Sequence, residues 1–249
     1  MAGRMVLGSA LAQLVRPASE MDESGAHRLL PVLPELGGLL PSRGLRRGST
    51  VAVDTARPAR GGTSLMLALL SEASRAGSWC AVVGVPALGV LAAAEAGIVL
   101  DRLALVPYPG PEWPTVVAAL IDGVDVVVAA APDGVSTVIT DRLAARARQR
   151  GSVLVTYGAW TGADVTLQIT DGAWDGLGQG RGRLTRRRLT ISATGRGAAA
   201  RPREIRVWLP SASARFTAVV AGTPGATTVT SADPPATSAG RPPLALVGP

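Results

Sequence analysis

The chain reads VAVDTARPARGGTSL from residue 51 to residue 65. An apolar β-run leads into a loop rich in turn-forming residues, and the loop leads into an apolar helical pattern. The same succession recurs from residue 49 to residue 157 in the order β-α-β-α-β-α-β-α-β. This order predicts an α/β fold with a mostly parallel sheet.

The predicted parallel strands are short apolar runs, and the predicted helices are longer periodic segments. After residue 157 the pattern changes to alternating runs joined by glycine-rich turns, which predicts antiparallel strands at 164–170, 184–193 and 204–209. Residues 21–49 are expected to be a loop. The parallel strands are expected at 49–53, 79–85, 103–107, 124–131 and 152–157, and the helices at 63–76, 88–96, 114–122 and 137–149.

Composition divides the chain into three parts. Residues 1–43 combine a helix, expected over 1–20, with a linker rich in proline and leucine. Residues 44–210 form the core domain, and residues 211–249 are a tail rich in alanine, proline and threonine whose composition indicates disorder. The first residues also resemble a signal peptide, but Arg16 follows the apolar stretch directly, so a helix packed on the domain is preferred.

All 25 basic residues of the chain are arginines, and lysine is absent. The net charge of +7 is unevenly distributed, because residues 142–206 carry 13 arginines against 4 acids. A basic segment of this kind indicates an anionic partner for one face of the molecule. Solvated arginines on an ordinary surface are the competing explanation.

The counts of cysteine and histidine exclude several kinds of site. His27 and Cys80 are the single residues of their types, which excludes a disulfide and a cysteine–histidine metal site, so no metal is expected. Nothing around His27 supports a Ser-His-Asp triad, and no catalytic residue is assigned. The lack of disulfides and of a membrane-length apolar run fits a cytoplasmic protein.

The loop after the first strand has the position of a phosphate-binding P-loop but lacks its lysine. The P-loop pattern ends in Gly-Lys-Ser/Thr, and here Gly62 stands at the lysine position while Thr63 keeps the hydroxyl. A structural turn without hydrolysis is therefore preferred. Weak ATP binding through backbone N–H groups, with charge from Arg60, is the alternative. The degenerate loop comprises Ala56, Arg60, Gly61, Gly62, Thr63 and Ser64.

Two arginine-rich segments are candidate contact surfaces. The helix at 137–149 has an arginine-rich face, and the strand at 184–193 contains three consecutive arginines, of which Arg187 alternates to the face opposite its neighbours. A ridge on DNA phosphates, a surface for an acidic partner and a charge-protected sheet edge are the three open explanations. The candidate residues are Arg142, Arg146, Arg150, Arg181, Arg183, Arg186, Arg187 and Arg188.

The segment GLGQGRGR at 176–183 fails the dinucleotide-binding pattern G-x-G-x-x-G and is expected to be a flexible basic loop. Trp174 lies just before it. An aromatic ring in this setting is suited to stacking on a base or to anchoring a protein contact. Packing of Trp174 into the core is the preferred expectation.

Residues 44–210 resemble the RecA family. GLRRGSTVAVDTARPARGGTSL resembles the family's opening through its first strand and P-loop, DVVVAAAPD at 125–133 resembles the Walker B strand, and VLVTY at 153–157 resembles the strand that ends at the γ-phosphate sensor. The resemblance implies a RecA-like P-loop NTPase fold with an antiparallel extension. The family's functional residues are replaced by Gly62 at the lysine, Ala130 at the Walker B acid, Pro86 near the catalytic glutamate and Tyr157 near the sensor glutamine.

A RecA-like domain stripped in this way is similar to the ImuA type of mutagenesis accessory protein. The similarity implies a non-catalytic role, without a nucleotide cofactor, in DNA repair and in SOS-induced translesion synthesis after DNA damage. The implied partners are a Y-family-polymerase-like protein and an error-prone replicative polymerase, with direct DNA contact left open. The alternative is an ATP-binding RecA-like recombinase with an unorthodox nucleotide site.

Overall fold

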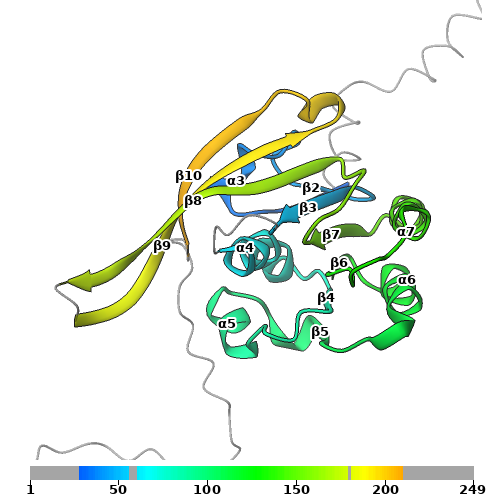
Figure 1. Cartoon of the computed structure of the whole chain (residues 1–249), viewed down its shortest axis with the longest axis horizontal. Coiled ribbons are helices and arrows are strands. Elements are labelled where there is room, and N and C mark those ends of the chain that lie inside the picture. Colours follow the sequence, from blue (N-terminus) through cyan, green and yellow to red (C-terminus); the bar gives the residue numbers. More distant parts are fainter. Residues whose placement is uncertain (1–27, 56–60, 179–180, 210–249) are drawn as a thin grey trace, which may run out of the picture. The chain divides into compact units, whose positions relative to one another are not determined.

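The computed structural model describes residues 28–55, 61–178 and 181–209 (Figure 1). The chain divides into two compact units after residue 217, and every described residue lies in the first unit. The helix expected over 1–20 and the tail expected at 211–249 lie outside the described residues.

An eight-stranded sheet runs through the described chain in the order β10-β9-β8-β3-β7-β6-β4-β5. β3 pairs in parallel with β7 on one side and with β8 on the other, and β6, β4 and β5 continue the parallel part. The predicted α/β class with a mostly parallel sheet is confirmed. The strands are β3 (Thr50–Asp54), β4 (Cys80–Val83), β5 (Leu103–Val106), β6 (Val126–Ala129), β7 (Val153–Tyr157), β8 (Val165–Gly178), β9 (Arg181–Gly195) and β10 (Arg203–Leu209).

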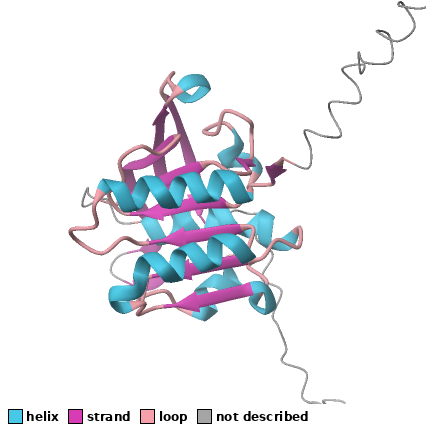
Figure 2. Ribbon diagram, turned by 90° about the vertical axis from the view of Figure 1, so that its right-hand side faces the viewer, coloured by secondary structure: helices cyan, strands magenta, loops and turns pink. Residues whose placement is uncertain are grey.

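Helices lie on both sides of the strands (Figure 2). On one face α4 and α5 pack against Val53 and its neighbours, and on the other α6 and α7 pack against Leu154 and its neighbours. The central parallel strands are continuous apolar runs because both of their faces are buried. None of the described helices is long and apolar enough to cross a membrane. The four helices, close to their predicted spans, are α4 (Gly62–Arg75), α5 (Val90–Glu95), α6 (Trp113–Gly123) and α7 (Thr137–Arg150).

Short regular elements replace the loop expected at 21–49, within the part of it that is described. β1 (Leu29–Leu30) pairs antiparallel with β2 (Leu45–Arg46), and α3 (Pro34–Gly37) lies between them in sequence. Leu36 of α3 is completely buried. The leucines of this segment therefore belong to the hydrophobic core, which is why the chain orders there despite its prolines and glycines.

The expectation of a flexible loop at 176–183 is wrong for all but residues 179–180, which are not described. β8 and β9 form a long hairpin whose pairing runs from Val165–Gly195 to Gly178–Arg181, with irregularities in β8 after Ile169 and after Asp175. Extended glycines fit this ladder because pairing satisfies their backbone donors and acceptors. The direction of β8 also differs from the expectation, since β8 is parallel to β3 and antiparallel only to β9. Figure 1 shows the hairpin reaching beyond the other strands.

Cys80 provides a chemical test of the core. Its side chain is buried in β4, and burial, with a smaller effect from Asp125, raises the pKa of the thiol to about 12. We expect no reaction of the native protein with an aromatic disulfide reagent at about pH 8, because the thiolate is the reactive species. Denaturation in guanidinium chloride should expose one reactive thiol, measured by the absorbance of the released reagent. Rapid labelling of the native protein would contradict the burial of Cys80.

The same thiol contributes a pH-dependent part of the stability. Its ordinary pKa is 9.0, so the unfolded chain loses this proton first as the pH rises. The contribution is therefore complete below pH 9.0 and is lost on the way to about pH 12. We expect the loss of stability above pH 9.0 to be smaller in Cys80→Ala, measured by urea unfolding at each pH.

Candidate functional site

The loop that resembles a degenerate P-loop connects the carboxyl end of β3 with the amino end of α4. Ligands of parallel α/β sheets bind at this edge, beyond the carboxyl ends of the strands. Gly61 precedes α4 with a φ of +137°, which favours glycine, and its carbonyl accepts a hydrogen bond from the amide of Leu65. Ala56 and Arg60 lie outside the described residues.

The site has no room for a side chain at Gly62, the position of the P-loop lysine. A Cβ added to Gly62 would lie 2.8 Å from the methyl carbon of Thr55 and 3.2 Å from the hydroxyl oxygen of Tyr157. The first distance is well below the optimal separation of two carbon atoms. The position expected for a P-loop lysine therefore has neither a charge nor the space for a side chain.

The hydroxyl of Thr63, at the position expected for the P-loop Ser/Thr, contacts another residue of the chain. The Oγ1 of Thr63 and the hydroxyl oxygen of Tyr157 are 3.1 Å apart, at hydrogen-bond distance. Tyr157 is the last residue of β7, the neighbour of β3, so its ring reaches the first turn of α4. In a working P-loop the corresponding hydroxyl binds Mg²⁺.

The neighbouring strand ends supply no acid at the Walker B position. Ala130 follows β6, and its backbone N–H donates to the carbonyl of Val83. A Cβ added to Gly84 would lie 2.7 Å from the carbonyl oxygen of Ala130, so the ends of β4 and β6 touch. Asp54, at the end of β3, accepts a hydrogen bond from the side-chain amide of Gln168 at 3.2 Å. Among the described residues no cluster of histidine, cysteine and acidic side chains is arranged to hold a metal ion.

Arg187 lies beside the degenerate loop. Its side chain is buried, with 6% of its surface exposed. A Cβ added to Gly61 would lie 3.2 Å from its Nη1, and one added to Gly172 would lie 3.2 Å from its Nη2. Its guanidinium carbon is 5.3 Å from the centre of the Trp174 ring. The guanidinium group of Arg187 therefore lies next to the amino end of α4. The sequence had instead predicted that Arg187 contacts a partner.

The preferred expectation for Trp174 is wrong, because 50% of its surface is exposed. Trp208 of β10 is also exposed, at 39%. Arg188 covers the ring of Trp208, with 5.9 Å from the guanidinium carbon to the ring centre. Each of these tryptophans thus stacks with one of two consecutive arginines of β9.

The arginines of β9 do not form a single ridge. Arg187 faces α4, whereas Arg188 is exposed on the opposite face of the sheet, as strand alternation predicts. In the backbone register of the hairpin, Arg186 lies opposite Asp175. Arg181 and Arg183 belong to the first residues of the same strand.

Two of the three candidate arginines of α7 are bound to a carboxylate of α6. The Nε of Arg146 donates to Asp122 at 2.8 Å, and the Nε of Arg150 donates to the same carboxylate at 3.0 Å. The hydrogen bond from Arg146 is the main cause of a lowered pKa of Asp122, to which Arg150 adds. Arg142 is exposed on the same helix.

Two features of the site escaped the sequence. Tyr157 was placed near a sensor position, but its bond to Thr63 depends on β7 lying beside β3, which the chain order alone does not reveal. The location of Arg187 could have been found, because alternation puts Arg187 on the same face as Leu189 and Ile191.

The crowding at Gly62 can be tested by comparing two helical glycines. Gly62→Ala should lower the free energy of unfolding by about 1–3 kcal/mol, because the new methyl group meets Thr55 and Tyr157. Gly123→Ala at the end of α6 meets nothing within 4 Å and should be neutral or stabilising. Thr55→Ser removes the nearest methyl group and should recover part of the loss in Gly62→Ala. Equal effects of the two alanines in urea unfolding would contradict this account.

The ion pairs of Asp122 predict a pH dependence. The pKa of Asp122 in the folded protein lies below its ordinary value of 3.8, so its contribution to stability is present above pH 3.8 and is lost as the pH falls through the folded pKa. We expect Asp122→Asn to lower the urea midpoint at neutral pH and to approach the parent protein in acid. Asp133→Asn, at another exposed position, is the control. A difference that stays constant with pH would exclude this role of the carboxylate.

The comparison with known proteins concerns the region that contains this site. Residues 38–162 match the family model described as the MT3502 N-terminal domain. Over 145 residues the chain is 39% identical to the uncharacterized protein Rv3395c of Mycobacterium tuberculosis (strain ATCC 25618 / H37Rv), in an alignment that covers 55% of this chain and 71% of that protein. The matched residues extend from just after α3 to the loop after β7, and they include Gly62, Thr63 and Tyr157. The chain therefore belongs to the MT3502 N-terminal domain family.

Proposed function

We propose that this protein is a non-catalytic, RecA-like accessory factor of DNA repair that acts by binding other macromolecules. The assignment to the P-loop NTPase fold draws on the resemblance of residues 44–210 to the RecA family. It is supported by the loop between β3 and α4, by the parallel strands that follow, and by the extension that contains the antiparallel β9. The role in SOS-induced translesion synthesis draws on the similarity to the ImuA type.

One observation carries the non-catalytic part of the proposal, namely the filled P-loop position. Gly62 faces Thr55 and Tyr157 without space for a side chain, and the hydroxyl of Thr63 is hydrogen-bonded to Tyr157. Phosphoryl transfer needs a cation on the phosphates and a held Mg²⁺ ion. The chain instead fills this place with its own tyrosine.

The binding part of the proposal is supported by the exposed arginines and tryptophans. Tryptophan and arginine are the residue types that most often carry the energy of protein interfaces. Trp174, Trp208 and Arg188 are exposed on the extension, and Arg142 is exposed on α7. The proposed partners are a Y-family-polymerase-like protein and an error-prone replicative polymerase, with DNA as a further ligand.

A titration with a fluorescent ATP analogue tests the proposal. With or without Mg²⁺ and single-stranded DNA, we expect no saturable binding up to about 1 mM, which corresponds to a binding free energy weaker than about −4 kcal/mol. Tyr157→Phe keeps the ring and removes the hydrogen bond to Thr63. We expect this variant to bind no nucleotide either, because position 62 still has no cationic side chain. Saturable, Mg²⁺-dependent binding by the parent protein would overturn the proposal.

A second candidate function, an ATP-binding recombinase-like protein with an unorthodox site, is favoured by Arg187. Its guanidinium group lies beside Gly61, where a cation could contact a phosphate at the amino end of α4. If the titration detects binding, Arg187→Met should abolish it, and Arg188→Met, on the opposite face, should not. Binding that survives in Arg187→Met would exclude this second candidate.

A further inference from the structure

One face of the β8–β9–β10 part of the sheet is turned away from α4. Along β10, Val207 and Leu209 are buried on the α4 side, whereas Arg206 and Trp208 are exposed on the other side. The register aligns Trp208 with Arg188 and Ala173, and Arg206 with Thr190 and Asp171. We name this surface the outer face. It comprises Asp171, Ala173, Arg188, Glu204, Arg206 and Trp208, with the buried Thr190 between them.

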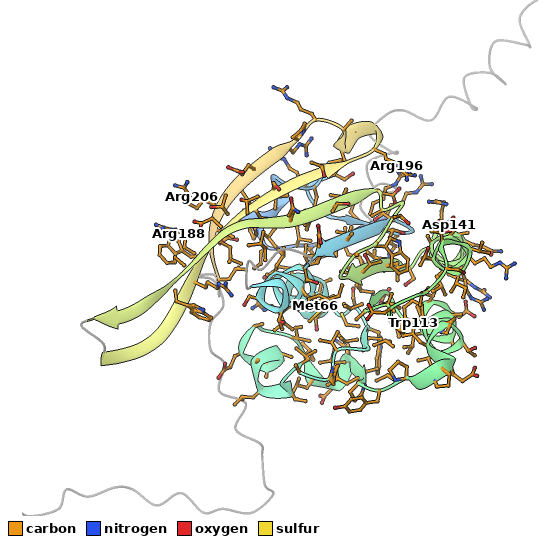
Figure 3. The ribbon with its side chains drawn as sticks, in the orientation of Figure 1. Met66, Trp113, Asp141, Arg188, Arg196 and Arg206 are labelled. Atoms are coloured by element: carbon orange, nitrogen blue, oxygen red, sulfur yellow. The ribbon has the colours of Figure 1, made fainter. Side chains whose placement is uncertain are left out.

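The centre of the outer face is a tryptophan with arginines beside it. Trp208 exposes 39% of its surface and carries the guanidinium group of Arg188 on its ring. Arg206 lies two residues before Trp208 on β10. Figure 3 shows Arg188 and Arg206 together at β9 and β10, away from Met66 in α4. A flat aromatic surface beside two guanidinium groups suits a ligand that combines an apolar side chain with carboxylates.

The charges around the outer face favour an acidic ligand. Residues 171–208, which include every residue of the outer face, contain nine arginines against three acids, so this segment carries an excess of positive charge. A field of this sign speeds the approach of acidic partners.

The carboxylates of the same face distinguish a protein ligand from a nucleic acid. Asp171 aligns with Arg206 across the three strands, and Glu204 is exposed two residues from Arg206. A nucleic-acid backbone laid on these strands would bring phosphates close to both carboxylates. A protein segment can offer hydrogen-bond donors to Asp171 and Glu204 while it places its own carboxylates beside the arginines.

We propose that the outer face binds an acidic segment of a protein partner, with an apolar side chain on Trp208 and carboxylates at Arg188 and Arg206. This inference rests on the proposed function in one respect, that the chain acts by binding another protein. It goes beyond that function because it assigns the contact to one face and one ligand chemistry.

The test uses the full chain and four fluorescent probes. The first is a peptide of about 15 residues, four helical turns in length, in which glutamates alternate with pairs of leucines. The second has the same number of glutamates without leucine, the third replaces glutamate by lysine, and the fourth is a single-stranded oligothymidylate of similar length. Binding of each probe is measured by fluorescence anisotropy.

The protein variants come in matched pairs. Arg188→Glu/Arg206→Glu is compared with Arg28→Glu/Arg46→Glu, which makes the same change of charge at exposed positions elsewhere. Trp208→Ala is compared with Trp79→Ala, which removes a tryptophan of similar exposure, 49%, before β4. Circular dichroism and thermal unfolding establish that each variant is folded before binding is measured.

We expect the acidic, leucine-containing peptide to bind most tightly, with an affinity reduced at least about tenfold by the outer-face variants and unchanged in their controls. Equal loss in the control pair would overturn the assignment to the outer face. Preference for the oligonucleotide, lost in the same outer-face variants, would replace the protein ligand by a nucleic acid and overturn the proposal.

A second measurement separates this inference from the proposed function. A photo-reactive amino acid in place of the exposed Ala173 is activated in the cell, and the cross-linked peptides are sequenced. An acidic segment with apolar residues, captured through Ala173 and not through the same label at the exposed Ala119 of α6, supports the inference. If polymerase-like partners still bind the Arg188→Glu/Arg206→Glu variant with full affinity, the inference fails while the proposed function stands. ATP binding would overturn the proposed function and leave the peptide result valid.

Discussion

β3 is the element on which the rest of the structure depends, because it is paired along both edges and buried on both faces. Its edges join β7 and β8, and Val51 and Val53 are buried in the core beneath α4. The amide of Thr50 is held by the carboxylate of Asp164 at 2.8 Å, which fixes the start of the strand. α4 packs on β3, and β7 lies beside β3. The contact of Tyr157 with Gly62 and Thr63 follows from this arrangement.

β9 lies between two different surroundings, with the loop before α4 on one side of the sheet and the outer face on the other. Arg187 and Arg188 are adjacent in sequence but lie on opposite faces, one buried near α4 and one exposed on Trp208. Burial of a guanidinium group is costly unless other groups compensate for the water it loses. The ring of Trp174 supplies part of that compensation through its π-face. Consecutive arginines of β9 thus contribute to packing as well as to positive charge.

The sequence alone predicted the strands that are buried on both faces and the helices that bury one apolar face. The continuous apolar runs of β4 and β6 and the periodic patterns of α4 and α7 predicted strands and helices close to those observed. The sequence predicted the wrong structure where contacts between distant segments outweighed a local pattern of residues. Glycines at 176–183 indicated a loop but are accommodated in a paired hairpin, and the proline- and leucine-rich segment before β3 is drawn into the core.

The candidate site was predicted only in part, for the same reason. The absence of lysine and of the Walker B acid is visible in the sequence, because each concerns a single position. The crowding of Gly62 by Thr55 and Tyr157 is not visible, because those residues are brought together by the pairing of β3 with β7. The exposure of Trp174 likewise depends on how far the hairpin extends beyond the strands that flank it.

The β8–β9 hairpin also has a consequence for the order in which the sheet can assemble. Its strands are joined by residues 179–180, so the first pairs close a very short loop, whereas the contact of Thr50 with Asp164 spans 114 residues. Loop-closure entropy grows with the logarithm of loop length, and contacts distant in sequence slow folding. The hairpin can therefore form locally during synthesis, while β3 keeps both edges unpaired until more than 100 further residues have been made. During that interval β3, whose two edges are both paired in the finished protein, is exposed to wrong pairing.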